Sequence, residues 1–108
     1  MQDQTIQTIQ SKLRTVISDI VGIEDGYLDV KLILNSQRLN IQIEGILLTA
    51  RYSLLGLQDI AAMHDINIEE EVYESLLYEA SFELDNDPKL KQTILNSCIE
   101  YKLDKMDL

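Results

Sequence analysis

The segment Leu28–Ile43, LDVKLILNSQRLNIQI, decides the fold class of this chain. In its first half every second residue is leucine or valine, a period of two that predicts a half-buried β-strand. After the polar turn residues Asn35–Arg38, the same period resumes in residues 39–43. Two strands joined by a short polar segment predict a β-hairpin. Because an isolated hairpin is only marginally stable, other elements must cover its apolar face.

The residues before the hairpin predict a covering helix at Gln4–Val21. Its apolar residues recur at three- and four-residue steps and fill one side of a helical wheel. Asp3 or Thr5 can cap its start, and Gly22 stands where a C-terminal cap is expected. The opposite side is rich in Gln, Thr and Ser, which is typical of a solvated face or of a face that lies under another subunit.

The residues that follow the hairpin admit two interpretations. Gly45 interrupts the alternation as a bulge or a turn, and residues 46–53 then continue it, which favours a third strand. The competing interpretation is a single helix over Leu47–His64. In the first interpretation only Leu57–His64 forms a short helix, after a turn.

The most acidic part of the chain is Asp65–Asp87, with nine carboxylates and no Lys or Arg. Asn67 is the predicted N-cap of a helix here, and glutamates fill its first turn, where the helix dipole stabilises negative charge. The apolar residues between Val72 and Leu84 form one seam that we expect to face the core.

A final helix is predicted at Pro88–Leu103, since Asp87 is a good N-cap and proline suits the first helical position. Its two apolar stripes are typical of a helix that is sandwiched in the core or lies partly at an interface. The stripes are Leu90, Ile94, Cys98 and Tyr101, and Leu95, Ile99, Leu103 and Met106.

The element order predicts an α+β fold: an N-terminal amphipathic helix, a small antiparallel sheet of two or three strands, then two or three C-terminal helices packed on the sheet. Residues 1–108 are expected to form one small domain.

The charge of the chain bounds its partners. The net charge is −10, and residues 65–108 hold twelve acids and four bases. This balance argues against direct binding of nucleic acid or of an anionic membrane, since both need a cationic surface. It is compatible with a basic protein partner, and also with plain solubility. No apolar run approaches the roughly 18–20 residues that span a bilayer, and the first residues do not resemble a secretory signal. A soluble, cytoplasmic protein is therefore expected.

Residues for catalysis or metal binding are few. His64 and Cys98 are the single histidine and cysteine, and Cys98 lies on an apolar stripe, where an inert buried thiol is usual. Asp85–Asp87 resembles the start of a calcium-binding loop, but Lys89 and Leu90 stand where a ligand and a glycine are required. The sequence thus predicts a non-enzymatic protein with no cofactor and no metal.

Two aromatic residues set the acidic helix apart, because Tyr78 and Phe82 share the face opposite its seam. If these rings are exposed, they can anchor an interface while the carboxylates steer a basic partner. If they pack under the hairpin or the final helix, only the glutamates face solvent. The first interpretation leads to the hypothesis that the helix over 68–85 docks a basic, nucleic-acid-handling protein, as an inhibitor or regulator. The predicted partner-binding residues are Glu70, Glu71, Glu74, Ser75, Tyr78, Glu79, Phe82, Glu83 and Asp85.

A sharper form of this hypothesis is a nucleic-acid mimic. A helix rises about 1.5 Å per residue and duplex DNA carries one charge per about 1.7 Å, so clustered carboxylates can imitate part of a phosphate row. The alternative hypothesis, of a different class, is a structural or assembly subunit. It would form a homo-oligomer through the C-terminal helix and the edge of the sheet.

Overall fold

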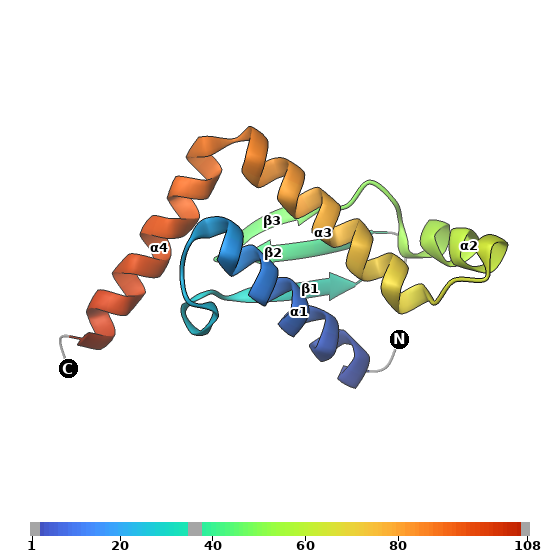
Figure 1. The fold of residues 1–108 in the computed structure, drawn as a ribbon, viewed down its shortest axis with the longest axis horizontal. Helices are drawn as coiled ribbons and strands as arrows, with labels where there is room; N and C mark the ends of the chain where they lie inside the picture. The colour runs from blue at the N-terminus through green and yellow to red at the C-terminus, as the bar shows by residue number, and fades with distance from the viewer. Residues whose placement is uncertain (1–2, 35–37, 107–108) are drawn as a thin grey trace.

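The computed structural model describes the backbone of residues 3–34 and 38–106, and the side chains of residues 4–24, 26–34 and 38–98. Within these ranges the chain forms an N-terminal helix, a three-stranded antiparallel sheet and three further helices, which confirms the predicted α+β class (Figure 1). No helix in the described ranges is long and apolar enough to cross a membrane. The elements are α1 (Asp3–Val21), the 3-10 helix η1 (Asp25–Tyr27), β1 (Val30–Leu34), β2 (Leu39–Ile43), β3 (Ile46–Thr49), α2 (Leu54–His64), α3 (Ile68–Asn86) and α4 (Pro88–Met106).

The sheet has the order β1-β2-β3, with both neighbouring pairs antiparallel. β1 and β2 form the predicted hairpin, while the predicted turn at 35–38 falls mostly on residues 35–37, outside the described residues. β2 and β3 are joined by the two-residue turn Glu44–Gly45, whose φ angles of 49° and 82° are both positive, as tight hairpin turns require. This turn returns the chain along β2 with Ile46 opposite Ile43. The third strand is therefore confirmed, and the single helix over Leu47–His64 is wrong.

One face of the sheet is buried and the other is open. α1 and α3 lie side by side across the buried face (Figure 1). On that face Leu32, Ile41 and Leu48 are directly paired across the three strands. The side chains between them face away from the helices, so that Ile33 and Leu47 are 38% and 55% exposed. The sheet thus has one packed face, as is usual for a small antiparallel sheet.

α1 is held at its end and along its length. Gly22, with φ of 88°, ends the helix in the left-handed region as predicted. The amides of Gly22 and Ile23 both donate to the carbonyl oxygen of Ser18, at 2.8 Å and 3.0 Å. The amide of Leu32 donates to Oε1 of Gln10 at 2.8 Å, so that α1 also covers part of the edge of β1.

Local capping sets the bounds of the other helices. α2 starts at Leu54, before the predicted Leu57, because the amide of Gly56 donates to Oγ of Ser53 at 3.0 Å. α4 starts at Pro88 as predicted, since Oδ1 of Asp87 accepts the amides of Lys89 and Leu90 at 3.1 Å and 3.2 Å. α2 and α4 extend from opposite ends of the sheet (Figure 1).

α4 runs to Met106, past the predicted end at Leu103. In its first apolar stripe Ile94 and Cys98 are fully buried and Leu90 is half-buried. Leu95, the one described member of the second stripe, is also half-buried against the core. The remaining members of both stripes, Ile99, Tyr101, Leu103 and Met106, lie outside the described side chains.

Candidate functional site

The orientation of α3 is set by its start and by its buried seam. Oδ1 of Asn67 accepts the amide of Glu69 at 2.9 Å, which confirms the predicted N-cap. Every fourth residue from Val72 to Leu84 is buried against the rest of the core. With one face fixed inward, the opposite face points away from the core. α3 carries seven carboxylates and no Lys or Arg, and its outer face holds the two aromatic residues singled out above.

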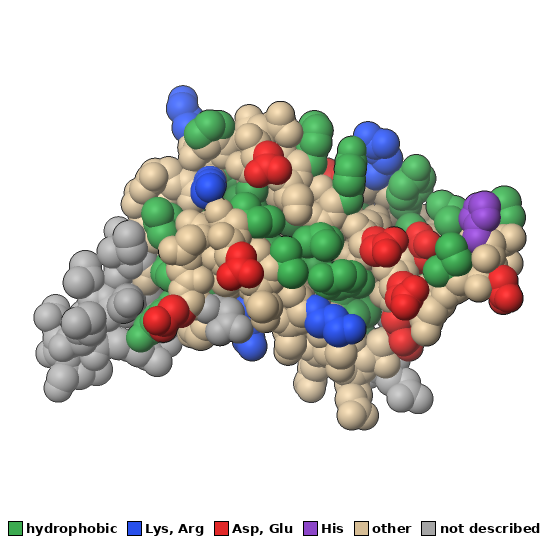
Figure 2. All heavy atoms as spheres, viewed as in Figure 1, with side chains coloured by type: hydrophobic (Ala, Val, Ile, Leu, Met, Phe, Trp, Pro, Cys, Tyr) green, Lys and Arg blue, Asp and Glu red, His purple; other side chains and the backbone are tan. Residues whose placement is uncertain are grey.

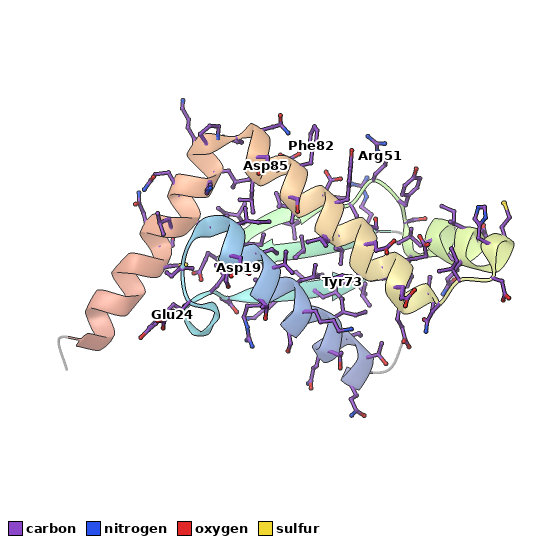
Figure 3. All side chains as sticks on the ribbon, in the orientation of Figure 1. Asp19, Glu24, Arg51, Tyr73, Phe82 and Asp85 are labelled. Carbon is purple, nitrogen blue, oxygen red and sulfur yellow. The ribbon has the colours of Figure 1, made fainter. Side chains whose placement is uncertain are left out.

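Both aromatic rings are exposed. Tyr78 is 60% exposed and Phe82 is 51% exposed, so the interpretation in which they pack under other elements is wrong. They lie one helical turn apart and stack on each other, with ring centroids 6.2 Å apart and an interplanar angle of 18°. Figure 3 places Phe82 on the side of α3 near Arg51, and Tyr73 on the opposite side, toward α1.

A groove lies beside these rings, between α3 and the segment that leads from β3 into α2. Its volume is about 350 Å³. A second hollow of about 240 Å³ adjoins it along α3, because Arg51, Tyr78 and Glu79 line both. Figure 2 shows carboxylates and hydrophobic side chains interleaved over the region where α2 and α3 meet. The two hollows together, called the α2–α3 groove below, are lined by Arg51, Tyr52, Leu57, Ile60, Glu71, Glu74, Ser75, Tyr78, Glu79 and Phe82.

The structure brings six of the nine predicted partner-binding residues together in the α2–α3 groove. These are Glu71, Glu74, Ser75, Tyr78, Glu79 and Phe82. The other three lie apart. Glu70 lines a separate hollow of about 300 Å³ between α1 and the start of α3, together with Lys12 and Tyr73. Glu83 is half-buried and Asp85 is exposed, and neither lines the α2–α3 groove. The role of all nine in partner binding stays a prediction.

Sequence reasoning missed the wall of the groove that faces α3. Arg51 and Tyr52 follow β3, and Leu57 and Ile60 belong to α2. One signal was present, because α2 has more apolar side chains than one buried face can use. The helix buries only Leu57 and Ala61, while its Leu55 and Met63 are 59% and 76% exposed and Tyr52, just before it, is 47% exposed.

The single cysteine is a structural residue in this geometry. Cys98 is fully buried, and its thiol donates to Oε1 of Glu44 at 3.6 Å. Burial, the nearby charge of Glu44 and this hydrogen bond raise the pKa of Cys98 to about 11, so the thiol stays protonated near neutral pH. His64 ends α2, at the opposite end of the sheet from α4 (Figure 1). The two side chains do not form a catalytic pair.

Other ligand chemistry has little support in the described part of the chain. No group of three or more His, Cys, Asp or Glu residues is placed there to hold a metal ion. Comparison of the sequence with protein-family models and with curated proteins, and of the structure with solved structures, found no match. The chemistry of the α2–α3 groove therefore has to be interpreted from its own residues.

Proposed function

We propose that this protein is a non-enzymatic acidic module that binds a basic partner protein through the outer face of α3, as an inhibitor or regulator. The observation that carries the proposal is the exposed, stacked pair Tyr78–Phe82 on a face that is otherwise rich in carboxylates. A merely solvated helix face gains nothing from two aromatic rings, because apolar surface in water costs about 25 cal/mol per Å².

The aromatic pair supplies affinity in this proposal. Buried aromatic side chains dominate the binding energy of many interfaces, and most contacts around them contribute little. A partner that covers about 100 Å² more of each ring gains on the order of 2.5 kcal/mol per ring. The two rings already stack on each other, so little side-chain entropy is lost when a partner covers them.

The carboxylates supply selection and speed. Glu71, Glu74 and Glu79 line the groove beside the rings, and the whole chain carries a net charge of −10. A field of this sign raises the association rate of basic partners and repels acidic ones. A partner that normally handles nucleic acid carries the required positive surface, and the acidic helix would then cover that surface.

The test is capture of binding proteins from the source cell on three forms of the protein. The wild type should retain a basic protein. Reversal of Glu71, Glu74 and Glu79 to Lys should abolish its retention. The matched control reverses Asp19, Glu24 and Asp29, which also changes the net charge by +6. Asp19 and Glu24 lie around the end of α1 (Figure 3), Asp29 directly precedes β1, and none of the three lines the groove. Retention by the control should equal that of the wild type.

The second measurement is the salt dependence of the association rate of the captured protein. Raising ionic strength shortens the Debye length from about 8 Å at 0.15 M to about 3 Å at 1 M. The association rate of the captured protein with the wild type should therefore fall with added salt. The proposal would be refuted if the captured protein is acidic, or if reversal of Glu71, Glu74 and Glu79 leaves its binding unchanged.

A second candidate function is self-association through the C-terminal helix and the edge of the sheet. The observation that favours it is the open outer face of the sheet, where Leu47 is 55% exposed on the edge strand β3. Light scattering at micromolar concentration would then give a multiple of 12.4 kDa, and Leu47→Lys would return the mass to that of one chain. A monomer in the wild type would eliminate this candidate.

A further inference from the structure

The α2–α3 groove combines two surfaces of different chemistry. Apart from Arg51, the wall from α2 and the segment before it is apolar, with Leu57 buried, Ile60 half-buried and Tyr52 47% exposed. The wall from α3 presents Glu71, Glu74 and Glu79 around Tyr78. The two walls come from different elements, because the apolar wall belongs to α2 and the segment after β3, and the acidic wall belongs to α3. A ligand that satisfies both walls must itself be part apolar and part cationic.

The charge inside the groove is unbalanced. Arg51 is the one Lys or Arg among the described residues that line it, against three glutamates. Arg51 is exposed and lines both hollows, next to Tyr78 and Glu79. A single guanidinium cannot neutralise three carboxylates, so the groove keeps an excess of negative charge. The position of Arg51 beside Tyr78 and Glu79 also shows how an arginine from a partner can lie against these two side chains.

The size of the groove limits the ligand. The larger of its two hollows has a volume of about 350 Å³, near the lower end of small-ligand pockets, which span roughly 300–1,000 Å³. It therefore takes one or two side chains at a time. Along α3, the lining residues run from Glu71 to Phe82, which is about 16 Å at a rise of 1.5 Å per residue. This length suits a short peptide segment.

We propose that the α2–α3 groove binds a short basic peptide segment of a partner protein. The segment places one large apolar or aromatic side chain against Tyr52, Ile60 and Tyr78, and its Lys or Arg residues lie beside Glu71, Glu74 and Glu79. Arg51 competes with the incoming cation for the same carboxylates. The inference rests on the proposed function and narrows its partner from a basic surface of any shape to a linear segment.

The experiment uses random peptides of about twelve residues displayed on phage, which are long enough to cross the groove at about 1.5 Å per residue as a helix or about 3.3 Å per residue when extended. They are selected on the full chain, with prior removal of phage that bind the Tyr78→Ala/Phe82→Ala variant. The enriched peptides should carry several Lys or Arg residues and at least one Leu, Ile, Met, Phe or Trp. Enrichment of acidic or uncharged peptides, or no enrichment above the unselected library, would overturn the inference.

Affinities of the enriched peptides, made synthetically with a fluorescent label, test the geometry. Tyr78→Ala should weaken binding about tenfold to a hundredfold, the range expected for an aromatic residue at the centre of an interface. Glu74→Gln with Glu79→Gln should weaken it and flatten its salt dependence, while Arg51→Ala should strengthen it. An oligolysine of equal charge should bind far more weakly, because it lacks the apolar side chain. Equal binding of oligolysine, or indifference to Tyr78→Ala, would contradict the inference.

The two proposals fail separately. If the cell-derived partner is lost on the triple charge reversal but no basic peptide is enriched, recognition uses a folded basic surface, and the linear segment is wrong. If basic peptides bind the groove but the cell-derived protein ignores the charge reversal, the groove is real and the proposed function is wrong. Circular dichroism of each variant distinguishes a lost contact from a lost fold. None of the substituted side chains is fully buried, since Glu71 and Glu79 are half-buried and the others are exposed, so the variants are expected to keep the fold.

Discussion

α1 and α3 are helices of 19 residues that cover the same face of the sheet, yet their outer faces differ completely (Figure 1). The outer face of α1 is mostly Gln, Thr and Ser, whereas that of α3 carries carboxylates and two exposed rings. Packing constrains only the inner faces, which therefore follow the same spacing of four. The residue types differ on the outer faces, which core packing does not constrain, so we attribute the difference to what each outer face contacts. The matching buried residues are Ile9, Leu13, Ile17 and Val21 in α1, and Val72, Leu76, Ala80 and Leu84 in α3.

The largest expected effect tests whether the two inner faces are equivalent. Leu13 and Leu76 are both fully buried. Leu13→Ala and Leu76→Ala should each lower the free energy of unfolding by about 2–5 kcal/mol, since each leaves a cavity in the core. Urea denaturation followed by circular dichroism measures this, with Gln7→Ala on the exposed face of α1 as the control. A cost below about 1 kcal/mol for either leucine would break the equivalence.

The next effect extends the comparison to α4, which buries Ile94 and Cys98 at the same spacing of four. The folded state raises the pKa of Cys98 from 9.0 to about 11, so it holds the thiol proton more tightly than the unfolded state does. Its contribution to stability is complete below pH 9 and is lost as the pH rises from 9 to about 11. The loss should be on the order of 1–2 kcal/mol.

The measurement is the free energy of unfolding of the wild type and of Cys98→Ala across this pH range. All other side chains are common to the two proteins, so the difference between the two curves isolates the thiol. The wild type should lose more stability than Cys98→Ala. Parallel curves would show that Cys98 has the same pKa in the folded and unfolded states.

A smaller effect concerns the start of α3. Asn67→Ala removes the acceptor of the Glu69 amide and should lower the free energy of unfolding by about 1 kcal/mol. Asn67→Asp keeps an acceptor and should retain most of the stability, although its added charge lies next to the glutamates of the first turn. Thermal denaturation of the three proteins is sufficient. If Asn67→Ala is as stable as the wild type, tertiary packing alone holds this end of α3.

The smallest effect separates stability from binding on the two outer faces. Tyr78→Ala and Phe82→Ala on α3, like Thr8→Ala and Ser11→Ala on α1, should change the free energy of unfolding by no more than about 0.5 kcal/mol. Only the α3 variants should weaken partner or peptide binding. Equal loss of binding from the α1 variants would show that the interface is not confined to the α3 side.

Much of the fold was predictable because its signals are local. Alternation in Leu28–Ile43 required a hairpin, and the cap residues Asn67 and Asp87 marked two helix starts that the structure confirms. The turn at Glu44–Gly45 left strand and helix both open, because a glycine fits either a tight turn or a helix end. The predicted start of α2 at Leu57 lies three residues after the observed start at Leu54, because Ser53 caps the helix there.

Only the part of the candidate site that belongs to α3 was predictable from the sequence. The spacing of Tyr78 and Phe82 placed them opposite the seam of α3, and a helical period of 3.6 residues is sufficient for that inference. It could not say whether anything covered them. That depends on where α2 and α4 lie, and those positions follow from which faces of distant elements bury the most apolar surface. The apolar wall of the groove, with Tyr52 and Ile60, was invisible for the same reason.

The sequence by itself determined the β1–β2 hairpin, the helices α1, α3 and α4, the caps Asn67 and Asp87, the buried seams of α1 and α3 and the concentration of negative charge in α3, because each depends on residues close together in the chain. The tertiary structure alone decided that the two rings face solvent and that α2 supplies an apolar wall beside Glu71, Glu74 and Glu79. The physical reason is that exposure is a property of neighbours in space. For Tyr78, the neighbours that matter are Arg51 and Tyr52, more than twenty residues earlier in the chain.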